Sequence, residues 1–499
     1  MRRSISKIFA DAARDTPDCI VVTDAAGDLT AAALDAAATR LAWELIARGV
    51  RRDDLVTITL PNTRAFIVAC VGTWRAGATP QPVAIDRSPG QRLAIARVAR
   101  PSAAIGAPTG ISGMPTIDDP LALEGRYPST APPDSYAASW KAPTSSGSTG
   151  SPKLVVATGP ALFDPTRPAA EFLPLAGVQL VSGPLSHSAV FTYAMRGLMT
   201  GHRLVVLPRF DERAWLDAVE RHAVTWALLV PTMMRRLLRL PEAERSVARV
   251  RSIETVLHMG APCAPDLKRG FLAWLGPERV VEVYAGSESN GLTLVRGDEW
   301  LRHPGTVGRP VGGTEILIRR SDGSPAAVGE AGEVWMRRGT ESAYRYLGAA
   351  SARDDDGWDT LRDIGHVDEE GRLYLRDRSD DVIVRGGEKI YPAEVEAVLE
   401  AHPAVRGAVA FGVPHPELGA VVAAVADIAG ADIDERELRA WAAERLDPAR
   451  RPCTLTLVRQ AVRNDAGKTS RAAWREACRS ADGSASRSGA SGVAMSAPR

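Results

Sequence analysis

Apolar residues recur along this chain at two spacings, which predict two kinds of secondary structure. Over residues 34–46 they return every three or four positions, the pattern of an amphipathic helix. Residues 55–60 then form a short run of apolar and β-branched residues, the pattern of a buried strand. The first expected unit is therefore a helix followed by a strand.

The same alternation returns in the middle of the chain. One helical stretch, Ala214–His222, lies among four strand-like runs: Leu204–Leu207, Trp226–Val230, Thr255–Met259 and Val280–Tyr284. Strands that alternate with helices predict an α/β domain with largely parallel sheets. Ligands of such domains bind at the carboxyl ends of the strands, so the residues that follow these runs are candidates for a site.

A charged run near residue 380 interrupts this pattern. Beyond it the sequence predicts a helix at Pro392–Ala401 followed by two strands, which together form a smaller α+β unit. We place the domain boundary at Ser379–Asp381, which gives domains at 1–378 and 379–480. Residues 481–499 are mostly Ser, Gly and Ala, a composition that predicts a disordered tail.

The composition excludes several classes of protein. The chain has 499 residues, 45% of them hydrophobic, which is enough for at least two cores. A formal net charge of +1 leaves no overall basic field for binding nucleic acid or anionic membranes. No apolar run approaches the roughly 18 residues of a membrane span, and the first ten residues lack the apolar stretch of a signal peptide. We therefore expect a cytoplasmic protein without a membrane span.

Cysteine and lysine are both scarce. The five cysteines form no C-x-x-C pair, so we expect reduced thiols and no zinc or disulfide framework. Only six of the 61 basic residues are lysine, so a lysine here marks a place where a compact point charge is wanted instead of a planar guanidinium. Three of the six, Lys153, Lys389 and Lys468, fall in segments flanked by glycine.

The densest chemical signal is a ten-residue segment of hydroxyl, glycine and lysine residues that ends at Pro152–Lys153. Such a segment is suited to wrapping a polyphosphate with backbone N–H groups, hydroxyls and one cation. A flexible Ser/Gly linker is the alternative, but the terminal Pro-Lys pair and the lack of a longer low-complexity context disfavour it. A Walker A loop is disfavoured because the glycine-to-lysine spacing is wrong. The candidate phosphate ligands are Thr144, Ser145, Ser146, Gly147, Ser148, Thr149, Gly150 and Lys153.

Further segments follow in a fixed order along most of the chain. They are Leu60–Asn62, Arg75–Ala78, Pro184–His187, Gly260–Pro262, Tyr284–Glu288, Asp363, Arg378, Gly386–Pro392, Gly412–Pro414 and Asn464–Lys468. Together with the phosphate segment, this set resembles the acyl-adenylate-forming superfamily, which includes acyl-CoA ligases, luciferases and peptide-synthetase adenylation domains. The resemblance implies a large N-terminal adenylate-forming domain and a small, mobile C-terminal domain.

The resemblance also implies ATP, Mg²⁺ and coenzyme A as ligands and a role for each matching residue. Lys468 would stand between the attacking carboxylate and the α-phosphate, His187 would gate the acid pocket, Glu288 would hold Mg²⁺ and Asp380 would be the hinge. The implied nucleotide contacts are Gly260, Ala261, Pro262, Tyr284, Ala285, Ser287, Asp363 and Arg378. The implied thiol-tunnel loop contains Gly386, Gly387 and Lys389, and the implied acyl pocket contains Phe191, Val230, Met259 and Gly286.

Some residues depart from the family pattern. Arg362 and Asp377 stand where glycines are usual, and Val462 replaces a proline. Ala285 and Ser287 replace a glycine and a threonine, although Ser287 keeps the hydroxyl. Arg362 is the departure that we expect to affect nucleotide handling or the second half-reaction.

The expected reaction is activation of a carboxylic acid as an acyl-AMP, followed by acyl transfer to coenzyme A. An amino-acid substrate is disfavoured because residues 182–195 contain no Asp or Glu to pair with its ammonium group. An amide synthetase, which passes the acyl group to an amine, and a catalytically silent homologue remain as alternatives. The uncharged gate and the small Ala285 and Gly286 favour an apolar acyl or aryl group. A carrier-protein thiol as acceptor and a homodimer are left open.

Overall fold

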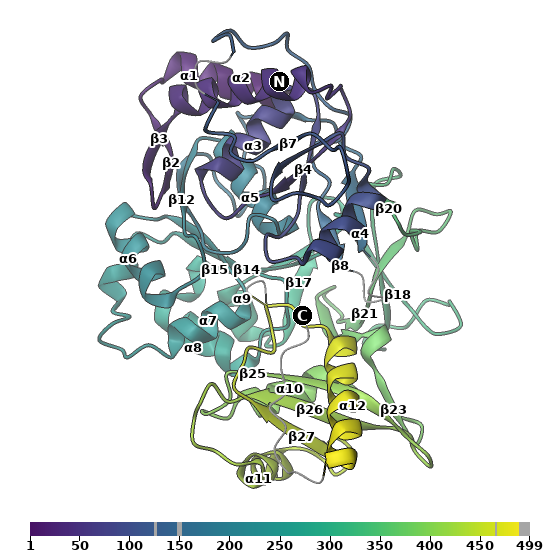
Figure 1. The fold of residues 1–499 in the computed structure, drawn as a ribbon. Coiled ribbons are helices and arrows are strands. Elements are labelled where there is room, and N and C mark those ends of the chain that lie inside the picture. The colour runs from purple at the N-terminus through teal and green to yellow at the C-terminus, as the bar shows by residue number, and fades with distance from the viewer. Residues whose placement is uncertain (124–126, 147–151, 465–466, 489–499) are drawn as a thin grey trace.

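The computed structural model describes residues 1–123, 127–146, 152–464 and 467–488, and it contains the predicted helix-strand alternation (Figure 1). The first expected helix is α2 (Ala31–Ala47), and the strand after it is β4 (Leu55–Thr59). The four strand-like runs of the middle region are β12 (His202–Val206), β13 (Trp226–Leu229), β14 (Thr255–His258) and β15 (Val280–Ala285). The helix among them is α6 (Glu212–His222).

A sheet of 13 strands forms the centre of the N-terminal part. Its middle is parallel and runs β15-β14-β13-β11-β12-β2, with β11 at Gly177–Val181 and β2 at Ile20–Asp24. Both faces of this part are covered. Leu228, Leu257 and Val281 pack into one hydrophobic cluster, whereas Val256 and Val280 pack into another. Burial on both sides explains why these strands are continuous apolar runs without polar alternation.

The two ends of this sheet are antiparallel. At one end β3 (Gly27–Thr30) pairs with β2, and the other end is built from β16 (Leu292–Arg296), β17 (Thr306–Pro310), β18 (Thr314–Arg319), β19 (Gly332–Arg338), β21 (Asp359–Val367) and β22 (Leu373–Arg378). The helices over the parallel part include α5 (Ser188–Met199), α7 (Pro231–Leu238), α8 (Pro265–Leu275) and, beside β16, α9 (Gly297–Arg302). The prediction of a largely parallel sheet therefore holds for its middle only.

Two smaller sheets flank the large one. A parallel sheet of order β5-β4-β6-β7 adds β5 (Thr79–Pro82), β6 (Ala103–Gly106) and β7 (Thr116–Ile117). The other is antiparallel and consists of β20 (Tyr344–Leu347), β9 (Pro152–Ala157) and β8 (Thr144–Ser146). Helix α3 (Arg64–Arg75) packs on the parallel sheet, α1 (Ile5–Asp15) packs on α3, and α4 (Pro89–Ala99) packs on β9. A short pair, β1 (Arg3–Ser4) with β10 (Leu162–Phe163), completes this part.

The C-terminal unit has its own sheet, with β25 (Gly407–His415) and β26 (Gly419–Asp427) at its centre, and Figure 1 shows it in green and yellow below the rest. The other members are β23 (Ile383–Arg385), β24 (Glu388–Ile390), β27 (Thr454–Val458), α10 (Pro392–Glu400), α11 (Glu435–Arg445) and α12 (Arg471–Ser488). Its two hydrophobic clusters draw on residues 383–478 alone. The division at residue 378 remains a prediction.

The predicted tail needs a correction. Helix α12 continues through Ser488, so residues 481–488 are helical instead of disordered, and residue 480 lies inside the helix. Once its first turns are anchored by the buried Trp474, each added residue gains a backbone hydrogen bond without a new nucleation cost. Residues 489–499 lie outside the described residues.

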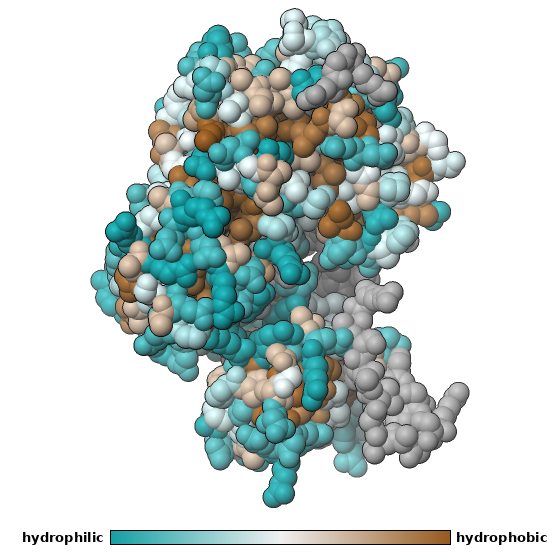
Figure 2. All heavy atoms as spheres, turned by 60° about the vertical axis from the view of Figure 1, so that its left-hand side comes forward, coloured by the Kyte–Doolittle hydropathy of each residue, from teal (hydrophilic) through white to brown (hydrophobic). Residues whose placement is uncertain are grey.

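On the face that Figure 2 displays, hydrophobic residues gather mainly over the upper, N-terminal part, and hydrophilic residues dominate the flank below it. Within the described ranges, no helix combines the length and the apolar character needed to cross a membrane.

Candidate active site

The predicted phosphate segment connects two strands of the small antiparallel sheet. Ser145 on β8 pairs with Lys153 on β9. The hydroxyl of Thr144 accepts a hydrogen bond of 3.0 Å from Gln81. Gly147, Ser148, Thr149 and Gly150 lie outside the described residues, as do the side chains of Ser145 and Ser146.

Lys153 is joined to Glu288 by a tyrosine that the sequence analysis did not identify. Lys153 Nζ donates to the Tyr346 hydroxyl at 2.9 Å, and this hydroxyl donates to Glu288 Oε1 at 2.6 Å. Lys153 Nζ also lies 3.7 Å from Glu288 Oε1. Burial and the neighbouring Glu288 raise the pKa of Tyr346, so its hydroxyl stays a donor. The only signal in the sequence was the Tyr-x-Tyr spacing of β20, which places Tyr344 and Tyr346 on one face of that strand.

The two predicted ribose ligands meet at the end of β15. Asp363 on β21 lies opposite Arg378 on β22, and the Tyr284 hydroxyl donates to Asp363 Oδ2 at 2.5 Å. Burial raises the pKa of Asp363 to about 6, whereas the hydrogen bond from Tyr284 and the charge of Arg378 act against the rise. A carboxylate and a guanidinium side by side can bind the hydroxyls of a sugar.

The remaining nucleotide candidates lie at neighbouring strand ends, as the pattern predicted. Gly260, Ala261 and Pro262 follow β14, and Ala285 and Ser287 lie at the end of the adjacent β15. Gly260 has a φ of +91°, which a residue with a side chain adopts only with strain. These segments and Val230, which caps α7 after β13, therefore share one edge of the sheet.

The absence of a side chain at Gly286 leaves room for two neighbouring side chains. A Cβ atom there would lie 2.6 Å from Leu361 and 2.8 Å from Glu288 Oε2, so the ends of these two side chains would have to shift. A substitution at Gly286 would therefore disturb Glu288.

Lys468 reaches this site from the C-terminal unit. The preceding Gly467 packs against Val230, since a Cβ atom at Gly467 would lie 3.4 Å from that side chain. Lys468 is exposed to solvent, yet the surrounding protein lowers its pKa, an effect that Glu288 opposes and that Arg378 adds to. The charges of Glu288 and Arg378 therefore act on Lys468.

His187 borders the same region as the N-cap residue of α5. Burial lowers its pKa to about 4, and the nearby cations Lys468 and Arg87 add to this effect. Its imidazole is consequently uncharged at neutral pH.

Phe191 does not belong with the other predicted acyl-pocket residues. Its ring packs against Phe66, Trp74 and Trp140 in the core, whereas Met259 lies in another cluster together with Tyr193. Two residues that are two positions apart on an α-helix are separated by a rotation of about 200° around its axis. Phe191 and Tyr193 therefore face opposite sides of α5. We therefore assign the pocket position on α5 to Tyr193 instead of Phe191.

The predicted thiol-tunnel loop lies away from this cluster. Gly386 and Gly387 form the turn between β23 and β24, with φ values of +56° and +90°. The turn is bonded to its own unit, because the Gly386 N–H donates to the Leu418 carbonyl at 2.8 Å. Among the described residues, no hydrogen bond or ion pair links Lys389 to Glu288 or His187.

The predicted hinge residue Asp380 lies in a short 3₁₀ turn (Ser379–Asp381) between β22 and β23. Its neighbour Asp377 joins the two units: Oδ2 accepts from the Ala393 N–H at the start of α10 at 2.8 Å, and Oδ1 lies 3.9 Å from Arg471. Arg362, the other departure from the family pattern, has a φ of +67°, a conformation that favours glycine.

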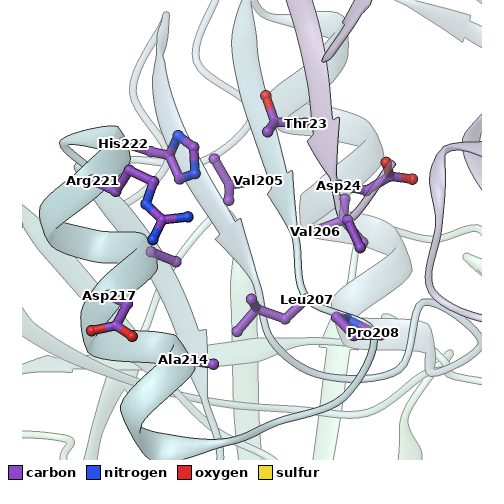
Figure 3. Close-up of a pocket in the computed structure, with 12 residues that line it drawn as sticks. Thr23, Asp24, Val205, Val206, Leu207, Pro208, Ala214, Asp217, Arg221 and His222 are labelled. Carbon is purple, nitrogen blue, oxygen red and sulfur yellow. The ribbon is translucent and has the colours of Figure 1, made fainter. Parts of the chain in front are cut away.

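A separate hollow lies near the β3 edge of the large sheet. It measures about 250 Å³ and is lined by residues of β2, β12 and α6, with Arg221 and His222 on one side and Thr23 and Asp24 on the other (Figure 3). None of the predicted site residues lines it.

Comparisons with known proteins agree with this geometry. The sequence model described as AMP-binding enzyme matches residues 9–347, and the model of the AMP-binding enzyme C-terminal domain matches residues 394–468. The chain is 31% identical to the feruloyl-CoA synthase of an Amycolatopsis species over 87% of this chain and 91% of that protein.

Two solved structures are similar over almost the whole chain. The o-succinylbenzoate CoA synthetase of Bacillus subtilis, in complex with its acyl-adenylate intermediate, is 26% identical, with a TM-score of 0.79 over 95% of this chain and 98% of that chain. The amide bond synthetase McbA of Marinactinospora thermotolerans is 25% identical, with a TM-score of 0.76 over 95% and 99%.

Proposed function

This chain belongs to the AMP-binding enzyme family, and we propose that it activates a carboxylic acid with ATP as an acyl-AMP and then transfers the acyl group to coenzyme A. The observation that carries the proposal is that Gly467 packs against Val230 at the strand-end edge, so that Lys468 enters from the C-terminal unit where the charges of Glu288 and Arg378 act on it and its own charge acts on the uncharged His187. The similarity to acid–CoA ligases supports the choice of acceptor.

In the first half-reaction a carboxylate oxygen attacks the α-phosphorus of ATP and pyrophosphate leaves. Both reactants are anionic, so a cation between them lowers the barrier by neutralising charge and by holding the reactants in line. Lys468 fills this position. Lys153 and the phosphate segment hold the departing phosphates, and Asp363 with Arg378 holds the ribose. Because His187 is neutral, it borders the acid without adding a competing charge.

Glu288 is suited to hold Mg²⁺ together with the phosphates. Its side chain is only 10% exposed, and it already attracts two hydrogen-bonded or charged partners, Tyr346 and Lys153. Magnesium bound to a nucleotide needs only one or two protein carboxylates, and it would supply charge neutralisation at the triphosphate.

In the second half-reaction the thiol attacks the acyl carbon and AMP leaves. Lys468 stands near the path of the thiol, so the C-terminal unit must turn about Asp380 to remove it and to bring in the Gly386–Lys389 turn. The two glycines of this turn give close access for an extended pantetheine chain.

The acceptor is tested by supplying acid, ATP and Mg²⁺ with either coenzyme A or a panel of primary amines. A thiol with a pKa of about 8.5 is a better nucleophile at neutral pH than a protonated alkylamine, which needs a general base. We expect the thioester to form much faster than any amide. Amide product with no thioester above background would identify an amide synthetase, and lack of ATP–pyrophosphate exchange with every acid would identify a silent homologue.

The Tyr346 hydroxyl provides a prediction for the phosphate side of the site. Tyr346→Phe removes the donor to Glu288 and the acceptor of Lys153, and hydrogen bonds to charged groups contribute enough to change affinity by about tenfold or more. We expect the KM for Mg-ATP in the exchange assay to rise by that factor while the KM for the acid stays within about twofold. Tyr344→Phe gives the comparison, because that hydroxyl contacts Asp359 and the Tyr346 hydroxyl but has no hydrogen bond to Glu288 among the described residues, so we expect a smaller effect on the KM for Mg-ATP. Equal effects of the two variants would contradict the role of Tyr346.

A further inference from the structure

Two cations without a paired carboxylate meet beside helix α5. Lys141 precedes β8 and is 4% exposed; its Nζ donates to Ser188 Oγ at 3.1 Å and to Thr192 Oγ1 at 2.7 Å. Arg196 lies one turn further along the helix. Both charged groups contact the Trp140 ring, Lys141 Nζ at 5.1 Å and Arg196 Cζ at 5.5 Å from its centre.

No anion in the described part of the chain is paired with either group. The ammonium of Lys141 is bonded only to hydroxyls, and no described hydrogen bond or ion pair involves the guanidinium of Arg196. Burial and the mutual repulsion of the two groups lower the pKa of Lys141 to about 7, which Glu288 only partly opposes. Arg338 adds further positive charge near Arg196. Lys141 is buried and Arg196 is partly exposed, and bringing a buried cation near a second cation costs free energy unless an anion joins them.

Helix geometry connects this pair with the acyl group. Ser188, Thr192 and Arg196 follow one another at four-residue intervals, so they form one stripe of α5 that starts next to His187. Tyr193 occupies the adjacent stripe, three residues before Arg196, and faces the cluster that contains Met259. Arg196 lies about 13 Å along the helix axis from His187, at 1.5 Å per residue, and its side chain points back toward that end.

We propose that the acid substrate carries a second anionic group, which binds between Lys141 and Arg196. The inference rests on the proposed function and narrows its substrate class to acids with a second carboxylate or a sulfonate. From the helix rise and the reach of the two side chains, the distance between the two anionic groups is on the order of 5–10 Å. This proposal differs from the expectation of an apolar acyl group, which rested on the uncharged gate and on the small Ala285 and Gly286.

The first test compares acids in matched pairs, each a monocarboxylic acid and its counterpart of equal length with a distal carboxylate. Examples are hexanoate with adipate and 4-methylbenzoate with terephthalate. In ATP–pyrophosphate exchange we expect at least one pair in which kcat/KM is at least about tenfold higher for the diacid than for the monoacid. One or two hydrogen bonds between charged groups provide a gain of this size. Higher activity with the monoacid in every pair would overturn the proposal.

The second test uses Arg196→Met and Lys141→Met, which keep much of the side-chain volume and remove the charge. We expect the ratio of kcat/KM for diacid over monoacid to fall at least about tenfold in each, and Arg196→Lys to restore part of it. Arg221→Met, in the separate hollow of Figure 3, is the matched control and should leave the ratio as it is. If kcat/KM falls equally for diacids and monoacids, Lys141 and Arg196 interact with the reacting carboxylate or only stabilise the fold. That result would contradict the proposal.

Calorimetry separates this inference from the proposed function. Binding of the diacid to the full chain without ATP is expected to weaken at least about tenfold in Arg196→Met, with an unchanged melting temperature. If that binding is present but no acid supports exchange, the proposed activity fails and the anion site stands. If monoacids support exchange and the diacid neither binds nor reacts, the activity stands and the anion site fails.

Discussion

Lys468→Ala is expected to lower the rate of acyl-AMP formation by roughly a hundredfold or more, the usual effect of removing one preorganised charged donor. The cation would be lost from between two anionic reactants, and Arg378, the other cation near Lys468, is assigned to the ribose. Consumption of preformed acyl-AMP with coenzyme A should stay close to that of the unchanged protein, because the thiol step begins only after Lys468 has left.

The two half-reactions are measured separately, by ATP–pyrophosphate exchange and by thioester formation from chemically prepared acyl-AMP. Lys7→Ala is the matched control, because Lys7 is an exposed lysine of α1 that is paired with Asp11 and is not among the site residues. Equal loss in both half-reactions would contradict the role given to Lys468.

Asp380→Pro is expected to slow thioester formation on the order of a hundredfold while adenylation changes little. Proline fixes φ near −65°, so it would hold the 3₁₀ turn between β22 and β23 in one conformation and prevent the C-terminal unit from turning. In the proposed mechanism, adenylation takes place in the arrangement described here, with Lys468 directed toward the site.

Asp380→Ala separates the effect of a fixed backbone from the effect of losing the Asp380 carboxylate. It removes the side chain and leaves φ free, so it should retain most of the transfer rate. Single-turnover measurements of both steps on the two variants provide the comparison. If the proline variant slows both steps alike, the boundary at Ser379–Asp381 is misplaced.

Two departures from the family pattern have different structural consequences. Asp377 accepts the Ala393 N–H and lies near Arg471, so it ties β22 to the C-terminal unit in the present arrangement. Arg362 occupies a left-handed conformation and is paired only loosely, 3.7 Å from Glu333. Asp377 therefore bears on movement of the C-terminal unit, whereas the expected effect of Arg362 on nucleotide handling or the second half-reaction stays a prediction.

The sequence by itself determined the α/β alternation, the strands whose ends carry the site and the order of the segments along them. These features are local, because an apolar run of a given length and its flanking residues specify a buried strand and its end. Parallel neighbours then place Val230, Gly260 and Ala285 at one edge whatever the rest of the chain does. The strand ends therefore indicated Gly260 and Ala285 as site candidates, and the resemblance to the acyl-adenylate-forming superfamily implied their contacts with the nucleotide.

Only the tertiary structure decided which side chains meet across distant segments. Tyr346 reaches Glu288 because β20 pairs with β9, and Lys141 meets Arg196 because the segment before β8 packs on α5. Phe191 and Tyr193 are separated by the rotation of α5, although both are aromatic residues two positions apart. Such contacts depend on sheet order and helix rotation, which the local pattern of hydrophobic and polar residues does not encode.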